Sequence, residues 1–225
     1  MTKKLSDIEP NRREVLVAAA AVTAQLMLPS TLVKAQESTL TTRRTGLDLD
    51  RFVQDCIVAN QQDESQAAVL EVLARAVSDP GRMLAAVGEP SRAGISIIHR
   101  SETLTIFNAV WTPQMNLMPH NHLMWANIGI YSGREDNIFW GESENRIEAF
   151  GAKALFEADA TSLPADAIHS VTNPLLRFTG GIHIYGGDFF DTTRSQWDPE
   201  TLDEEPSDGD VIRSMFEREN QRLGI

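Results

Sequence analysis

The chain has 225 residues, of which 42% are hydrophobic, so it can form one domain of ordinary size with a substantial core. Its 32 acidic and 20 basic residues give a formal net charge of −12. This acidic excess argues against nucleic acid and anionic lipid surfaces as partners, because both would be repelled. Cys56 is the only cysteine, which excludes an intrachain disulfide. Its position in an amphipathic run predicts a buried apolar residue rather than a nucleophile.

Residues 1–35 are typical of an export signal. Arg12 and Arg13 precede an uncharged apolar stretch, and a small-residue cleavage site ends at Ala35. The paired arginines resemble a twin-arginine signal, which implies the Tat export machinery as a partner and a periplasmic location after cleavage near Ala35. No stable membrane association is expected once the signal is removed. An uncleaved N-terminal anchor is the alternative, although the apolar stretch is short for a bilayer span.

After a polar linker over 36–46, residues 47–225 are expected to form a single domain with helices at both ends. Apolar residues repeat at helical spacing twice within 47–80, and this helical pair is expected to pack outside the rest of the fold. An acidic, solvated loop over 191–208 is expected to precede a final helix over 209–223. Ser207 or Asp208 can cap the start of that helix.

The region 93–190 is made of short apolar or alternating runs separated by turn signals. Many short strands with regular turns predict a mainly β sandwich or jelly-roll barrel. In this region Glu135 belongs to a polar, turn-like segment. We expect Glu135 to be structural and to orient a strand turn through Arg134 or backbone groups.

Three histidines of this region form a candidate metal site. His120 and His122 are two residues apart, so on a strand both side chains point to one face. His169, from a later strand, can supply a third imidazole. Three neutral nitrogens suit Fe, Zn, Cu or Ni and leave other coordination positions open for chemistry.

Both histidine segments resemble the sequence motifs of the cupins. His120, His122 and Gly133 are in register with the first cupin motif, and His169 with Asn173 resembles the second, although Asp166 replaces its glycine. The resemblance implies a cupin, or RmlC-like, jelly-roll barrel with a double-stranded β-helix over 93–190. Metal ligation by His120, His122 and His169 follows from the same resemblance.

The first cupin motif usually ends in a glutamate ligand, and this chain has Ala126 there, followed by Asn127. The predicted site is therefore three neutral imidazoles without a carboxylate. A divalent ion held in this way keeps its full charge and should attract an anionic co-ligand. A thiolate fits that description, because metal coordination deprotonates a thiol, and an enolate fits as well.

A closer resemblance is to the cysteine dioxygenase family of thiol dioxygenases, and within it to an uncharacterised branch of predicted metal-dependent double-stranded β-helix enzymes. It covers about residues 95–190 and rests on the three histidines together with His183 and Tyr185. The family's serine-histidine-tyrosine relay implies a catalytic role for His183 and Tyr185, although Gly181 replaces the serine. The cysteine that some members link to this tyrosine is Asn127 here.

The same resemblance implies Fe(II) as the metal, with Zn, Ni, Cu or Mn as other options. The substrates implied are O2 and a small thiol. Family members that bind cysteine hold its carboxylate with an arginine, for which Arg92 and Arg100 are candidates. Two other functions stay open: a three-histidine cupin dioxygenase acting on a diketone or another enolate, and a non-enzymatic periplasmic cupin that binds a metal or ligand.

Overall fold

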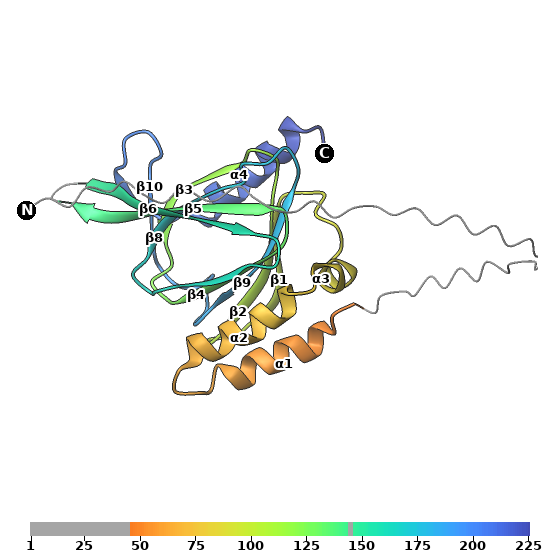
Figure 1. Cartoon of the computed structure of the whole chain (residues 1–225). Coiled ribbons are helices and arrows are strands. Elements are labelled where there is room, and N and C mark those ends of the chain that lie inside the picture. Colours follow the sequence, from red (N-terminus) through yellow and green to blue (C-terminus); the bar gives the residue numbers. More distant parts are fainter. Residues whose placement is uncertain (1–45, 144–145) are drawn as a thin grey trace, which may run out of the picture. The chain divides into compact units, whose positions relative to one another are not determined.

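The computed structural model describes residues 46–143 and 146–225, which form two antiparallel β-sheets with helices at both ends (Figure 1). The predicted signal peptide lies outside the described residues, as does the predicted linker except for Gly46. Within the described part of the chain, no helix is long and apolar enough to cross a bilayer.

The first sheet has five strands in the order β1-β2-β9-β4-β7. Their bounds are β1 Gly94–Arg100, β2 Thr105–Trp111, β4 Ala126–Ser132, β7 Ala160–Leu163 and β9 Thr179–Tyr185. The second sheet has six strands in the order β11-β10-β3-β8-β5-β6. Their bounds are β3 Asn116–Asn121, β5 Arg134–Ser143, β6 Arg146–Phe156, β8 Ile168–Thr172, β10 Ser195–Trp197 and β11 Glu204–Pro206.

The chain passes back and forth between the two sheets, so paired strands are often distant in sequence. β2 pairs with β9, and β3 pairs with β8. This exchange is the arrangement of a jelly roll. Phe107, Ile128 and Leu155 belong to the apolar cluster that contributes side chains from both sheets to the interior. The predicted mainly β jelly-roll barrel with terminal helices is therefore confirmed.

The N-terminal helices α1 (Leu49–Ala59), α2 (Ser65–Val77) and α3 (Pro80–Val87) belong to a second apolar cluster on the outer face of the first sheet, as predicted for the helical region. Cys56 and Leu73 pack there with Ile106 and Ile182. A Cβ at Gly129 on β4 would lie 2.9 Å from the Leu73 side chain, so glycine permits the close approach of α2. Cys56 is buried as predicted, and burial raises the pKa of its thiol to about 12.

Two local predictions change. The helical region contains a third helix, because residues 79–81 follow the end of α2 and begin α3: the Asp79 side chain accepts a hydrogen bond from the Arg82 amide, and proline is tolerated in the first helical turn. The segment 191–208 is not a loop throughout: β10 and β11 extend the second sheet beside β3. The final helix, α4 (Gly209–Arg222), starts at the predicted cap, where the Asp208 side chain accepts from two backbone amides.

Candidate metal centre

The three predicted metal ligands meet inside the barrel. β3 pairs with β8 so that His120 lies directly opposite His169, and His122 follows two residues after His120. Their candidate ligand nitrogens all lie within 4.8 Å of one another, and His122 Nε2 is 3.2 Å from His169 Nε2. All three side chains are buried. The sequence spacing therefore located this cluster correctly.

Hydrogen bonds determine which ring nitrogen of His120 and of His169 is free to bind a metal. His120 Nδ1 lies 3.0 Å from the Met118 carbonyl oxygen, which can only accept, so Nδ1 carries the proton and Nε2 keeps its lone pair. His169 Nδ1 lies 2.6 Å from Asn137 Oδ1 and donates to it in the same way. A metal-binding histidine is typically held like this through its other nitrogen.

The residues present fit a metal ion. His122 Nδ1 is buried and without a hydrogen-bond partner, while its Nε2 faces His169 Nε2 at 3.2 Å. Because His169 carries its proton on Nδ1, its Nε2 has only a lone pair to offer to His122 Nε2. A cation bound by both nitrogens would accept this lone pair. Burial lowers the pKa of His120 to about 4, and burial together with the neighbouring imidazoles holds the pKa of His122 and His169 well below the usual value. The rings are thus neutral at pH 7, which is the form that binds metals.

The residues at the position of the usual glutamate ligand do not join the cluster. Among the described residues, the only group of metal-ligating side chains near enough to hold an ion consists of the three histidines. Asn127 points toward α2, where its side-chain amide donates to the Gln66 carbonyl over 2.9 Å.

His183 and Tyr185 both face the interior beside the cluster, as their spacing on β9 predicts. The Tyr185 hydroxyl lies 3.4 Å from His183 Nδ1, and the Tyr185 ring packs at 4.9 Å, centroid to centroid, against His122. His183 is stacked on Phe107. Burial, reinforced by the charge of Glu135, raises the pKa of Tyr185, so its hydroxyl keeps its proton at neutral pH.

The position of the missing serine is closely packed. A Cβ at Gly181 would lie 3.0 Å from an Ile130 methyl and 3.3 Å from His183 Nε2. A side chain at Gly181 would thus point at the outer nitrogen of His183. In this protein another residue approaches that nitrogen.

That residue is Glu135, and the prediction that it orients a strand turn was wrong. Its side chain is fully buried inside the barrel, where it accepts hydrogen bonds from Trp111 Nε1 at 2.9 Å and Asn137 Nδ2 at 3.1 Å. His183 Nε2 lies 3.3 Å from its carboxylate, within ion-pair range although not aligned as a strict hydrogen bond. Burial alone would raise the pKa of Glu135, but His183 and these donors outweigh it and hold that pKa below its usual value.

Strand alternation explains the error. Residues 135 and 137 face inward on β5, whereas Arg134 and Asp136 point the other way and pair with each other at 2.6 Å. The polar run over residues 134–137 concealed this alternation, because consecutive polar residues are typical of a turn.

A cavity of about 540 Å³ opens above the cluster. Its floor includes His120, His169, His183 and Tyr185. Its walls are largely aromatic and include Phe107, Trp111, Phe189, Phe190 and Phe216. Four arginines, Arg92, Arg100, Arg194 and Arg213, and one carboxylate, Glu217, also line it, which gives a mainly apolar space a mostly positive rim.

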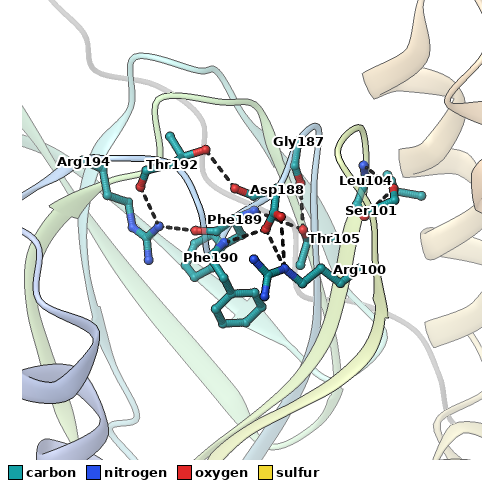
Figure 2. Close-up of polar contacts among 10 residues, drawn as sticks. All are labelled: Arg100, Ser101, Leu104, Thr105, Gly187, Asp188, Phe189, Phe190, Thr192 and Arg194. Carbon is teal, nitrogen blue, oxygen red and sulfur yellow. Dashed lines mark hydrogen bonds and ion pairs between the residues drawn. The ribbon is translucent and has the colours of Figure 1, made fainter.

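These arginines differ in how free they are to bind a ligand, and Arg213 is paired with Asp210 at 2.7 Å. Arg92 is exposed, and Arg100 is paired with Asp188 at 2.8 Å (Figure 2). Arg194, which was not predicted from the sequence, lies over the Phe189 ring at 3.8 Å and donates to the Phe189 carbonyl. Arg194 has no carboxylate partner among the ion pairs of the described residues, and burial lowers its pKa. Its position in a segment expected to be an acidic loop gave no signal.

The loop after β9, which carries Phe189 and Arg194, is held to the barrel by hydrogen bonds, as Figure 2 shows. Thr105 Oγ1 on β2 donates to the Gly187 carbonyl at 2.7 Å and accepts from the Phe189 amide at 3.1 Å. The loop therefore holds Phe189 and Arg194 in place over the floor of the cavity.

The chain matches no protein-family model and no curated protein sequence. Among solved structures it is similar to a protein from Bacillus halodurans, with 17% identity and a TM-score of 0.39 over 43% of this chain and 72% of that one. An RmlC-like cupin with a double-stranded β-helix fold from Methanocaldococcus jannaschii is 10% identical, with a TM-score of 0.38 over 46% and 87% of the two chains. A variant of oxalate decarboxylase from Bacillus subtilis is 17% identical, with a TM-score of 0.33 over 41% of this chain and 23% of that one. Likenesses at this level assign no activity.

Proposed function

We propose that the protein is a mononuclear non-haem iron dioxygenase that oxidises a small thiol with O2. The observation that carries this proposal is a cluster of three neutral imidazoles with no carboxylate ligand, beside a buried tyrosine at the floor of a mainly apolar cavity. His120, His122 and His169 hold the metal, for which Fe(II) is our first choice and another divalent ion is the alternative. When bound, iron supplies O2 activation and favours the thiolate form of the substrate.

The residues of the chain supply position and exclusion of water. Aromatic walls formed by Phe107, Trp111 and Phe189 keep the floor dry, which strengthens electrostatic interactions there. The Tyr185 ring packs against His122, so its hydroxyl lies beside the reactants, and the hydrogen bond between this hydroxyl and His183 Nδ1 holds it in position.

The charges favour an anionic substrate. The three neutral ligands leave the charge of a divalent ion uncompensated in its own shell, and Arg194 adds a partly buried positive charge at the cavity wall. A thiol that also carries a carboxylate would place its sulfur at the floor and its carboxylate near Arg194. Arg92 and Arg100 line the same cavity, are more exposed to solvent and can attract such an anion.

Two alternatives remain. An enolate such as that of a diketone is also anionic, and the aromatic walls favour it over a strongly polar thiol. A cupin that binds a metal or ligand without catalysis is the second alternative.

Oxygen uptake by the iron-loaded protein distinguishes these functions. We expect uptake with one or more small thiols and none with diketones. Uptake only with diketones would select the enolate reaction, and no uptake with either class would leave a binding protein. His99→Gln is a suitable control, because His99 lies on β1 outside the cluster.

We further propose that the protein is exported to the periplasm through the twin-arginine route, from the pattern around Arg12 and Arg13. Replacement of both arginines by lysine should leave the protein in the cytoplasm. Cell fractionation checks this, and undiminished export of the lysine variant would point to another route.

A further inference from the structure

A continuous chain of polar side chains crosses the barrel interior and joins the histidine cluster to Tyr185. His169 Nδ1 is 2.6 Å from Asn137 Oδ1, and Asn137 Nδ2 is 3.1 Å from Glu135 Oε1. Glu135 Oε2 is in turn 3.3 Å from His183 Nε2, and His183 Nδ1 is 3.4 Å from the Tyr185 hydroxyl. Glu135 stands at the middle of this chain and is not among the residues that line the cavity.

An ionised carboxylate can only accept hydrogen bonds, and this decides the direction of every bond on the side of the cluster. Asn137 must turn its NH2 group toward Glu135, which leaves Oδ1 facing His169. His169 must then carry its proton on Nδ1, so its Nε2 lone pair points at His122 and is free for a metal. Glu135 therefore determines the tautomer of His169 without touching it.

The carboxylate acts in the same way on the side of Tyr185. His183 Nε2 faces the carboxylate, so the neutral ring carries its proton on Nε2 and presents the lone pair of Nδ1 to the Tyr185 hydroxyl. Gly181 leaves this side of His183 free of a side chain, and Glu135 reaches it from the opposite sheet.

We propose that Glu135 is a positioning residue that sets the tautomers of both His169 and His183. Its buried carboxylate thereby leaves His169 Nε2 free to bind a metal and orients the Tyr185 hydroxyl through His183. The part that concerns metal binding rests on the proposed function, whereas the two tautomers are properties of the protein itself.

The proposal predicts a specific change of tautomer in the variant Glu135→Gln. Glu135 Oε2 accepts from Trp111 and lies 3.3 Å from His183 Nε2, while Oε1 accepts only from Asn137. In the variant Glu135→Gln, the oxygen of the introduced amide should thus occupy the Oε2 position, and its NH2 group should face Asn137. Asn137 then has to turn over, and His169 is driven to the tautomer with a proton on Nε2, where a metal would bind.

The matched rescue is the double variant Glu135→Gln, Asn137→Asp. An aspartate in place of Asn137 accepts from the glutamine on one side and from His169 Nδ1 on the other, so the original tautomer of His169 returns. Glu142→Gln, at the exposed end of the same strand, is the control for removal of a carboxylate from β5.

The first experiment is 15N NMR of the imidazole rings in the metal-free full-length parent and in these variants. We expect the parent to carry protons on Nδ1 of His169 and Nε2 of His183, and Glu135→Gln to change His169 alone. Protonation of His183 on Nδ1 in the parent, or an unchanged His169 in Glu135→Gln, would overturn the proposal. The parent measurement decides the first point even if the variant fails to fold.

The second experiment is titration of the same proteins with Zn²⁺. Loss of an outer-shell partner typically lowers metal affinity by about 10- to 100-fold, and we expect a fall in this range for Glu135→Gln with recovery in the double variant. Parent-like affinity in Glu135→Gln, or no recovery in the double variant, would contradict the proposal. If the parent shows the expected tautomers but binds no Zn²⁺, the proposed metal function fails and the positioning role of Glu135 stands.

Discussion

The floor of the cavity and its mouth are built from different parts of the fold. The floor is made by strands: His120 and His169 are cross-strand partners on β3 and β8, and His183 and Tyr185 share one face of β9. The mouth depends on the loop after β9, which supplies Phe190 and Arg194, together with α4, which supplies Ile212 and Phe216. This difference indicates that the barrel determines the chemistry, whereas the loop determines which substrate reaches it.

The largest effect should come from removing a ligand at the floor. His169→Ala leaves two imidazoles and should abolish stable metal binding, a fall in affinity greater than the roughly 100-fold typical of outer-shell changes. Metal analysis of the purified protein checks this. His99→Gln should keep its metal, and retention of metal by His169→Ala would show that the ion lies elsewhere.

Tyr185→Phe tests the floor without touching a proposed ligand. It removes only a hydroxyl, so fold and metal content should survive. If that hydroxyl assists the transition state, turnover should fall by about 10- to 1000-fold. Oxygen consumption and metal content measured beside the parent check this, and full activity at full metal content would reduce His183 and Tyr185 to packing residues.

Acid should destabilise the folded protein through the buried histidines of the floor. The pKa of His120 falls from its usual value to about 4 on burial, so between about pH 6.5 and 4 the unfolded chain binds a proton that the folded chain does not. Stability of the metal-free protein is therefore full above about pH 6.5 and decreases as the pH falls, by about 1.4 kcal/mol per pH unit for each such proton. His122 and His169 act in the same direction.

Urea denaturation at pH 7, 6 and 5 in the presence of a chelator checks this dependence. His120→Gln should have a shallower pH dependence than the parent. Equal stability of the parent at pH 7 and 5 would mean that these histidines are not buried in solution.

The smallest effect should come from the arginines at the mouth. Arg194→Met should raise KM for a carboxylated thiol, with a loss of about 10- to 100-fold in kcat/KM from one charged hydrogen bond. Arg100→Met should change it less, because Arg100 is already paired with Asp188. Steady-state kinetics compares the two, and a larger loss for Arg100→Met would assign the substrate carboxylate to the outer rim.

The sequence predicted most residues of the floor of the cavity and missed the new residue at its mouth. His183 and Tyr185 follow from the two-residue period of β9, and the close spacing of His120 and His122 places His122 directly after the end of β3. Glu135 required a correct strand assignment through a run of polar residues.

Arg194 was unpredictable for a different reason. Its position over Phe189 depends on the course of a loop, which Thr105 fixes from a distant strand. The third helix was missed because Asp79 and Pro80 serve both as the end of one helix and as the start of the next. In each case the missing information was tertiary.

The central claim, a three-imidazole metal site open to a thiol, is tested most directly by X-ray absorption at the zinc edge of the Zn²⁺-loaded protein, with and without a small thiol. The account predicts three imidazole nitrogens at about 2.0–2.1 Å, and a sulfur neighbour at about 2.3 Å after thiol is added. A carboxylate in place of one imidazole, or fewer than three imidazoles, would contradict the account.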